Sequence, residues 1–377
     1  MAGIYIHIPF CKQACHYCDF HFSTSLKYKD DMLKAIEKEI AIQQDFLGEE
    51  KIETVYFGGG TPSLLNSDEI NRITEQIQHL YNADNLIEVT LETNPDDLSS
   101  QKIASLKQTL VNRFSIGIQS FFNEDLLWMN RAHHAKDAEF AIKASQDAGF
   151  ENLTIDLIYG YPLLNEDKWN YNISRVIDMN IPHVSCYSMT VEPKTALASF
   201  IKKGTEKNMD DTESSEQFLY LSSRLQESGF EHYEISNFAR NNRYSIHNTN
   251  YWKGVKYLGI GPSAHSFDGK NRQWNIANNA KYIQSLTNGV IPAEQEILSS
   301  KDRINEYIMT SLRTMWGLDL NKIEAEFAKY QPVIIKNLSK FFEKNWVTQK
   351  DNHVILTVSG KLYADYIASE LFIEDEF

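Results

Sequence analysis

Cysteine is scarce in this 377-residue chain, which contains only four, and so few thiols exclude a small disulfide-stapled scaffold. No apolar run approaches the roughly 20 residues that a membrane-spanning helix needs. The first nine residues have neither the basic flank nor the apolar length of a signal peptide. We therefore expect a cytoplasmic protein, and its 42% hydrophobic content is enough to bury one or two large cores.

Basic residues are also in the minority. The chain has 37 Lys and Arg against 51 Asp and Glu, a formal net charge of −14. A protein that binds nucleic acid through the phosphates needs a surplus of positive charge on at least one face. We therefore expect no nucleic-acid partner, and the acidity mainly favours solubility.

Short β-rich apolar runs alternate with helical stretches in the first half of the chain. Between the first two runs, Met32, Ile36 and Ile40 recur at helical spacing. Six β-then-α units in succession predict a parallel sheet with helices outside it, either doubly wound or closed into a complete or partial barrel. The expected strands are Gly3–His7, Thr54–Phe57, Ile87–Glu92, Arg113–Ile118, Asn152–Ile158 and Val184–Ser188.

Chemically unusual residues follow every expected strand but the last. They include three cysteines after the first strand, the glycine triplet Gly58–Gly60 after the second, and Glu92–Pro95 at the end of the third. Barrel enzymes collect their functional residues at the carboxyl ends of their strands. We therefore favour an α/β fold with a curved, partial (β/α)6 barrel over a flat sheet.

The pattern changes in the second half of the chain. Asp210–Gly229 predicts a helix, and Tyr233–Ser266 is a polar, aromatic segment of uncertain structure. From Lys301 onward, short helices and a hairpin predict a small winged-helix-like α+β domain. We divide the chain into a barrel (1–230), an extension (231–300) and a C-terminal domain (301–377). The last has a slight acidic excess, so we expect a lid over the barrel or a docking surface rather than a DNA-binding module.

Three of the four cysteines, Cys11, Cys15 and Cys18, lie within eight residues. Three thiolates at this spacing can each bind a different iron of a 4Fe–4S cubane, which leaves the fourth iron open for another ligand. The alternative is a zinc site completed by His16 or His21. The position of the cysteines directly after the first strand of a barrel favours the cluster.

The Cys-x3-Cys-x2-Cys triad resembles the signature of the radical S-adenosylmethionine superfamily. This resemblance implies that S-adenosylmethionine chelates the open iron and that an electron from the cluster can cleave its sulfonium. The phrases Tyr5–Cys11, Phe57–Ser63, Gly117–Phe121, Asn130–Arg131 and Asp156–Gly160 extend the resemblance over nearly the whole chain, to the oxygen-independent coproporphyrinogen oxidases and the HemW-type haem chaperones. By the same resemblance, the S-adenosylmethionine sites are lined by Tyr5, Tyr17, Gly59, Gly60, Thr61, Glu92, Gln119, Arg131 and Asp156.

Two departures separate the chain from the oxidases that it resembles. Those enzymes have a longer segment before the first cysteine, and a fourth cysteine where this chain has Phe20. In the other direction, the segment His247–Trp252 matches the HNxxYW pattern of the HemW-type haem chaperones. The resemblance therefore implies haem carriage rather than oxidation of a porphyrinogen.

The hexapeptide has the chemistry that haem binding needs. Its imidazole can bind haem iron, its amide can orient the imidazole, and its aromatic faces can lie against a porphyrin. We expect haem contacts from His247, Asn248, Tyr251 and Trp252. A purely structural role for this segment stays open, and the rival axial ligands are His133, His134, His183 and His265.

These features together predict a haem chaperone that carries haem, a 4Fe–4S cluster and S-adenosylmethionine, and that transfers haem to an acceptor protein. A membrane respiratory enzyme is one candidate acceptor, and the chain would then reach the membrane only peripherally, through that partner. The alternative is an oxygen-independent coproporphyrinogen III oxidase, which forms protoporphyrinogen IX by radical decarboxylation. Whether the chain forms a homodimer stays open.

Overall fold

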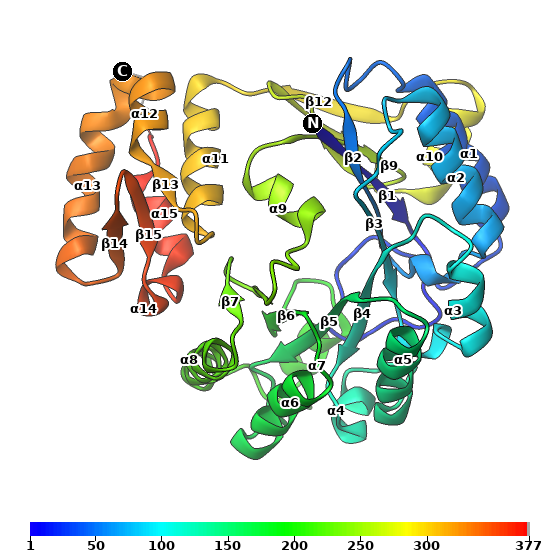
Figure 1. The fold of residues 1–377 in the computed structure, drawn as a ribbon, viewed down its shortest axis with the longest axis horizontal. Helices are drawn as coiled ribbons and strands as arrows, with labels where there is room; N and C mark the ends of the chain where they lie inside the picture. Colours follow the sequence, from blue (N-terminus) through cyan, green and yellow to red (C-terminus); the bar gives the residue numbers. More distant parts are fainter. Residues whose placement is uncertain (375–377) are drawn as a thin grey trace.

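One continuous sheet of twelve strands organises the computed structural model, which describes residues 1–374 (Figure 1). Its middle consists of six parallel strands that pair in sequential order. They are β1 (Ala2–Ile8), β2 (Ile52–Gly59), β3 (Glu88–Thr93), β4 (Arg113–Gln119), β5 (Asn152–Tyr159) and β6 (His183–Ser188). All six expected strands are confirmed to within two residues at either end.

The sheet is open, because β1 and β6 each pair with a further strand instead of with one another. β9 (Lys256–Ile260) lies parallel to β1, and β8 (Asn237–Ala239) lies antiparallel to β6. The partial barrel expected from the sequence is therefore confirmed.

Helices cover the outside of the parallel strands (Figure 1). Each of the longer ones buries a single apolar stripe. In α1 the buried residues include Met32, Ile36 and Ile40, at the spacing that one face of a helix requires. The helices of this layer are α1 (Lys29–Ile42), α2 (Ser67–Leu80), α3 (Ser100–Leu106), α4 (Asn123–Trp128), α5 (Ala135–Asp147), α6 (Glu166–Asp178), α7 (Ala196–Lys202) and α8 (Asp211–Glu227).

The extension expected at residues 231–300 lengthens the sheet at both edges. β7 (Glu231–His232) and β8 continue it beyond β6, whereas β9, β10 (His265–Phe267), β11 (Asn271–Asn275) and β12 (Ala293–Ile297) continue it beyond β1. The two edges are joined through α9 (Ile246–Trp252), which packs against β1, β2 and β9. The helix α10 (Asn279–Thr287) packs on α1. The extension therefore shares the sheet of the barrel, and the boundary at 230/231 stays a prediction.

The C-terminal domain has its own buried cluster of apolar side chains, from Ile304 to Ile373. Its elements are α11 (Ser300–Leu312), β13 (Leu318–Asp319), α12 (Leu320–Phe327), α13 (Gln331–Glu343), β14 (Val347–Lys350), β15 (His353–Leu356), α14 (Val358–Lys361) and α15 (Ala364–Leu371). The strands form a small antiparallel sheet. The expected helices and hairpin are thus confirmed, and residues 375–377 lie outside the described residues.

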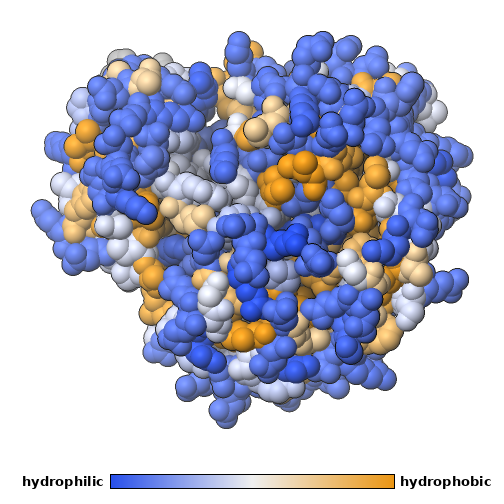
Figure 2. Space-filling view, viewed as in Figure 1, coloured by the Kyte–Doolittle hydropathy of each residue, from blue (hydrophilic) through white to orange (hydrophobic). Residues whose placement is uncertain are grey.

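The surface seen from the side of Figure 1 is mostly hydrophilic and is recessed between the C-terminal domain and the body of the sheet (Figure 2). Among residues 1–374, no helix combines the length and the apolar character that crossing a bilayer requires.

Candidate functional site

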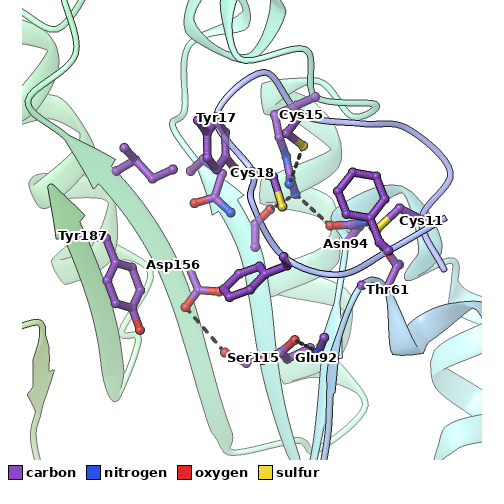
Figure 3. A pocket seen from close by; sticks show the side chains of 18 of the residues that line it. Cys11, Cys15, Tyr17, Cys18, Thr61, Glu92, Asn94, Ser115, Asp156 and Tyr187 are labelled. Carbon is purple, nitrogen blue, oxygen red and sulfur yellow. Dashed lines mark hydrogen bonds between the residues drawn. The ribbon is translucent and has the colours of Figure 1, made fainter. Parts of the chain in front are cut away.

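The cysteine-rich loop (residues 9–28) joins β1 to α1 and closes over the carboxyl ends of the parallel strands. Cys11, Cys15 and Cys18 are half-buried in it and line a cavity of about 400 Å³, the first cavity, together with residues from β2 to β6 (Figure 3). A cavity of this volume is in the range that holds a cofactor. The parallel sheet thus brings the unusual residues of successive strands to one rim.

Eight of the nine residues expected at the S-adenosylmethionine sites line the first cavity, whereas Tyr5 lines a different one. The eight are Tyr17, Gly59, Gly60, Thr61, Glu92, Gln119, Arg131 and Asp156. Gln119 ends β4 with a positive φ of 65°, a conformation that few residues other than glycine adopt. Their assignment to S-adenosylmethionine stays a prediction.

The glycine triplet lets β2 pass directly beside the start of the cysteine-rich loop. A Cβ atom on Gly60 would lie 2.6 Å from the carbonyl oxygen of Phe10 and 2.8 Å from that of Ile8. The Gly60 N–H donates to the latter oxygen at 2.9 Å. Gly59 has a φ of 105°, which strains any residue with a side chain. These glycines are therefore needed for packing as well as for access to the cavity.

Arg131 ties the cysteine-rich loop to the ends of β3 and β4. Its guanidinium donates to the Oδ1 of Asn94 at 2.7 Å and to the carbonyl oxygen of Gly117 at 2.6 Å, and it lies 3.4 Å from the Sγ of Cys15. The preceding Asn130 donates to the carbonyl oxygen of Ala14 at 2.7 Å. Arg131 and Asn130 together hold the part of the loop that carries Cys15 against the ends of the neighbouring strands.

Glu92 and Asp156 place two carboxyl groups deep in the first cavity. Glu92 accepts hydrogen bonds from the Tyr56 hydroxyl at 2.8 Å and from the Gly59 N–H at 3.1 Å, and Asp156 accepts one from Ser115 at 3.5 Å (Figure 3). Desolvation raises the pKa of Glu92 to about 7 and that of Asp156 to about 6. A cationic ligand in the cavity would favour their ionised forms.

The raised pKa of Glu92 predicts how the stability of the cofactor-free protein depends on pH. The unfolded chain releases this proton near its ordinary pKa of 4.5, and the folded chain releases it near 7. The folded state holds more protons between these values, so its free energy of unfolding falls as the pH rises through this window, by up to about 3 kcal/mol from this group. Glu92→Gln should flatten that fall in urea denaturation at pH 5, 6, 7 and 8, and equal slopes for variant and wild type would contradict the assignment.

The donor set fits an iron–sulfur cluster better than a single zinc ion. No three His, Cys, Asp or Glu side chains in residues 1–374 lie close enough together to hold one metal ion. Each of the two histidines of the zinc alternative uses one ring nitrogen in a hydrogen bond: His16 Nδ1 bonds the carbonyl oxygen of Trp128 at 2.8 Å, and His21 Nε2 bonds Asn279 at 2.7 Å. Cubane ligands, by contrast, each bind a different iron and stand further apart.

The hexapeptide His247–Trp252 forms α9 and its side chains divide between two cavities. His247 is buried, with Nδ1 2.8 Å from the Thr54 Oγ1 and Nε2 2.8 Å from the Tyr251 hydroxyl. Burial lowers the pKa of its imidazole to about 3. Asn248 lines the first cavity, whereas Tyr251 and Trp252 line the other. In this conformation His247 offers iron no free ring nitrogen, and haem ligation by it stays a prediction.

The rival histidines differ in how free their rings are. His133 Nε2 bonds the carbonyl oxygen of Ile118 at 3.1 Å, and His183 bonds both Thr154 and Tyr233. His134 sits at the start of α5 on the surface. His133 and His265 both line cavities; the Nδ1 of His133 has no hydrogen-bond partner, and neither ring nitrogen of His265 has one within the described residues.

The first cavity also contains residues that sequence reasoning did not assign to it: Tyr56, Asn94, Arg113, Ser115 and Tyr187. Asn94 lies within the unusual Glu92–Pro95 segment, and Arg113 is a charged residue at the start of an apolar strand. A place in the cavity could therefore have been predicted for both from the sequence. The sequence did not distinguish Tyr56, Ser115 and Tyr187 as cavity residues, because polar and aromatic residues are common within strands.

Comparison with known proteins agrees with this geometry. The family model described as Radical SAM superfamily matches residues 5–173, and the model described as HemN C-terminal domain matches residues 298–363. The fold is that of Escherichia coli coproporphyrinogen III oxidase (HemN), a radical SAM enzyme, with a TM-score of 0.85 and 22% identity over 98% of this chain and 90% of that one.

Curated relatives match over the full length. The Heme chaperone HemW of Bacillus subtilis (strain 168) is 30% identical over 97% of this chain and 98% of its own, and that of Lactococcus lactis subsp. lactis (strain IL1403) is 30% identical over 98% and 97%. With its cysteine triad, open parallel sheet and HemN-type C-terminal domain, the chain belongs to the HemW family of the radical SAM superfamily.

Proposed function

We propose that this protein is a haem chaperone that holds a 4Fe–4S cluster through Cys11, Cys15 and Cys18, binds S-adenosylmethionine beside it, and delivers haem to an acceptor protein. The observation that carries the proposal is the meeting of the three thiols with eight other expected residues in one cavity of about 400 Å³. Its full-length relatives are named haem chaperones, which supports the haem part.

The residues of the first cavity have distinct tasks in this proposal. The cluster, when bound, would supply an electron to the sulfonium of S-adenosylmethionine. The backbone of Gly59 and Gly60 leaves room for the methionine moiety, and Glu92 can accept from ribose hydroxyls. Arg131 holds the cysteine-rich loop against β3 and β4 through Asn94 and Gly117.

Two reactions separate a haem chaperone from the oxidase alternative. Protein purified and reconstituted without oxygen should take up hemin saturably and pass it to an apo-haem protein, which absorption spectra before and after separation of the two proteins would report. It should not convert coproporphyrinogen III in the presence of S-adenosylmethionine and a reductant.

Conversion of coproporphyrinogen III would overturn the proposal and favour the oxidase. Absence of both hemin uptake and conversion would also overturn it. A variant with Cys11, Cys15 and Cys18 all replaced by serine serves as the control, because it separates haem uptake from any process that needs the cluster.

A further inference from the structure

A second cavity, of about 660 Å³, lies between the β1–β9–β10 side of the sheet and the helices α11 and α12 of the C-terminal domain. It adjoins the first cavity: Phe20, two residues after Cys18, lines both, and α9 places Asn248 in the first and Trp252 in the second. Its volume suits a cofactor-sized ligand.

Aromatic rings form much of the wall of the second cavity. Tyr251 and Tyr257 meet edge to face with ring centroids 4.5 Å apart. The aromatic side chains that line it are Tyr5, Phe20, Tyr251, Trp252, Tyr257, Phe267, Tyr307 and Phe327. Such walls suit a flat, conjugated ligand, since ring faces and edges pack well on aromatic systems.

Two of the four cationic side chains that line the second cavity have no acidic partner within the described residues. Arg272 pairs with Glu306 at 2.6 Å, and Arg303 lies 4.0 Å from Glu326. The other two lining cations, Lys253 and Lys322, have no ion pair within residues 1–374, and each lies over an aromatic ring at 4.4 Å. The surplus of two positive charges matches a ligand with two carboxylates.

One histidine of the second cavity has both ring nitrogens free of hydrogen bonds within residues 1–374. His265 is exposed and stacks on Trp274, and no hydrogen bond of the described residues engages its ring. Of the other two lining histidines, His7 has both ring nitrogens engaged, by Tyr5 and by the carbonyl oxygen of His21, whereas His21 uses only Nε2, in its bond to Asn279. No Cys or Met of the described residues lines the cavity.

The backbone under His265 is held firmly. Ser266 accepts a hydrogen bond from the Gly259 N–H at 2.9 Å, and only a glycine fits at this crossing because a Cβ there would collide with the carbonyl group of His265. Desolvation by the cavity wall and the nearby charge of Arg272 lower the pKa of the His265 imidazole, so its neutral, metal-binding form is favoured at pH 7.

We infer that haem binds in the second cavity, with His265 as its axial ligand and with Lys253 and Lys322 facing the two propionates. This inference rests on the proposed function and assigns the ligand to β10 rather than to α9. In it, His247 is a positioning residue that holds Tyr251 at the cavity wall through the bond between its Nε2 and the tyrosine hydroxyl.

The first test titrates hemin into anaerobically reconstituted wild type and His265→Ala. Loss of the ligand should lower the affinity at least about tenfold and shift the Soret band, since even partners that only support a metal ligand are worth 10–100-fold. Added imidazole should restore the wild-type spectrum in His265→Gly. His79→Ala is the matched control, because His79 is exposed on α2, outside both cavities.

The outcomes distinguish the inference from the function on which it rests. If wild type binds no hemin saturably, the proposed function itself fails. If wild type binds hemin and His265→Ala binds it with unchanged affinity and spectrum, the inference is overturned while the function stands. A spectral shift in His247→Gln without one in His265→Ala would place the ligand on α9.

A second test addresses the propionates. The double variant Lys253→Glu/Lys322→Glu should bind hemin about tenfold more weakly, because two partly exposed charge pairs become repulsive. It should bind the dimethyl ester of hemin as wild type does, since that ligand carries no carboxylates. Equal weakening for both ligands would contradict a role of these lysines in binding propionates.

Discussion

Replacing Cys11, Cys15 and Cys18 together by serine should abolish iron–sulfur binding, from about four iron and four sulfide per chain to none. A serine hydroxyl stays protonated at neutral pH and cannot replace a thiolate as a ligand of iron. Iron and sulfide analysis, together with absorption and electron paramagnetic resonance spectra of protein made without oxygen, would measure the loss.

Cys186→Ala is the matched control for this experiment, because Cys186 is buried in β6, faces away from the first cavity and lines neither cavity. It should retain the full cluster. Wild-type protein that holds a single zinc ion instead, or that stays colourless when iron and sulfide are ample, would contradict the assignment of the triad.

Replacing Glu88 by alanine should lower the free energy of unfolding by about 3–5 kcal/mol. Glu88 and Arg113 are both only 1% exposed, with the Arg113 Nε 3.9 Å from a carboxylate oxygen. The same carboxylate accepts the N–H groups of Ile246 at 2.8 Å and His247 at 2.9 Å, which begin α9. Truncation leaves the buried guanidinium without its paired carboxylate, with only the hydroxyls of Thr90 and Thr154 as partners, and leaves two N–H groups without an acceptor. Urea denaturation of the cofactor-free protein would measure the loss.

The control for Glu88 is Glu75→Ala, since Glu75 is exposed on α2 and has no ion pair within residues 1–374. Its effect should stay within about 0.5 kcal/mol. Hydrogen exchange adds a local readout, because the amides of α9 should lose protection in Glu88→Ala earlier than those of α1. A loss below about 1 kcal/mol would mean that water or a rearranged Arg113 satisfies the buried charge.

Glu88 also shows why the conformation of α9 could not be predicted from its own residues. The helix has only seven residues, too few to be stable alone, and its first turn depends on a carboxylate 158 residues earlier in the chain. The sequence of the hexapeptide therefore predicts a set of groups that bind haem. In the folded protein, however, its histidine is buried between Thr54 and Tyr251.

The six parallel strands were predictable because each is a short apolar run between turn residues, a local pattern that needs no knowledge of partners. The cysteine triad and the residues after each strand were predictable for the same reason, and the parallel order of the sheet then brings them to one rim. Tyr5 lines the second cavity, and its ring stacks on that of Tyr56, which lines the first, so its assignment to S-adenosylmethionine stays a prediction.

The amino-acid sequence alone determined the alternation of strands and helices, the triad Cys11, Cys15 and Cys18, and the membership of the chain in its family, because each depends on neighbours along the chain. Tertiary structure decided which histidine has no hydrogen bond to its ring, which lysines have no acidic partner, and which side chains of α9 line each of the two adjoining cavities. These depend on contacts between residues far apart in the sequence, such as those of His247 with Thr54, 193 positions apart, and of His21 with Asn279, 258 positions apart, and no local pattern contains them.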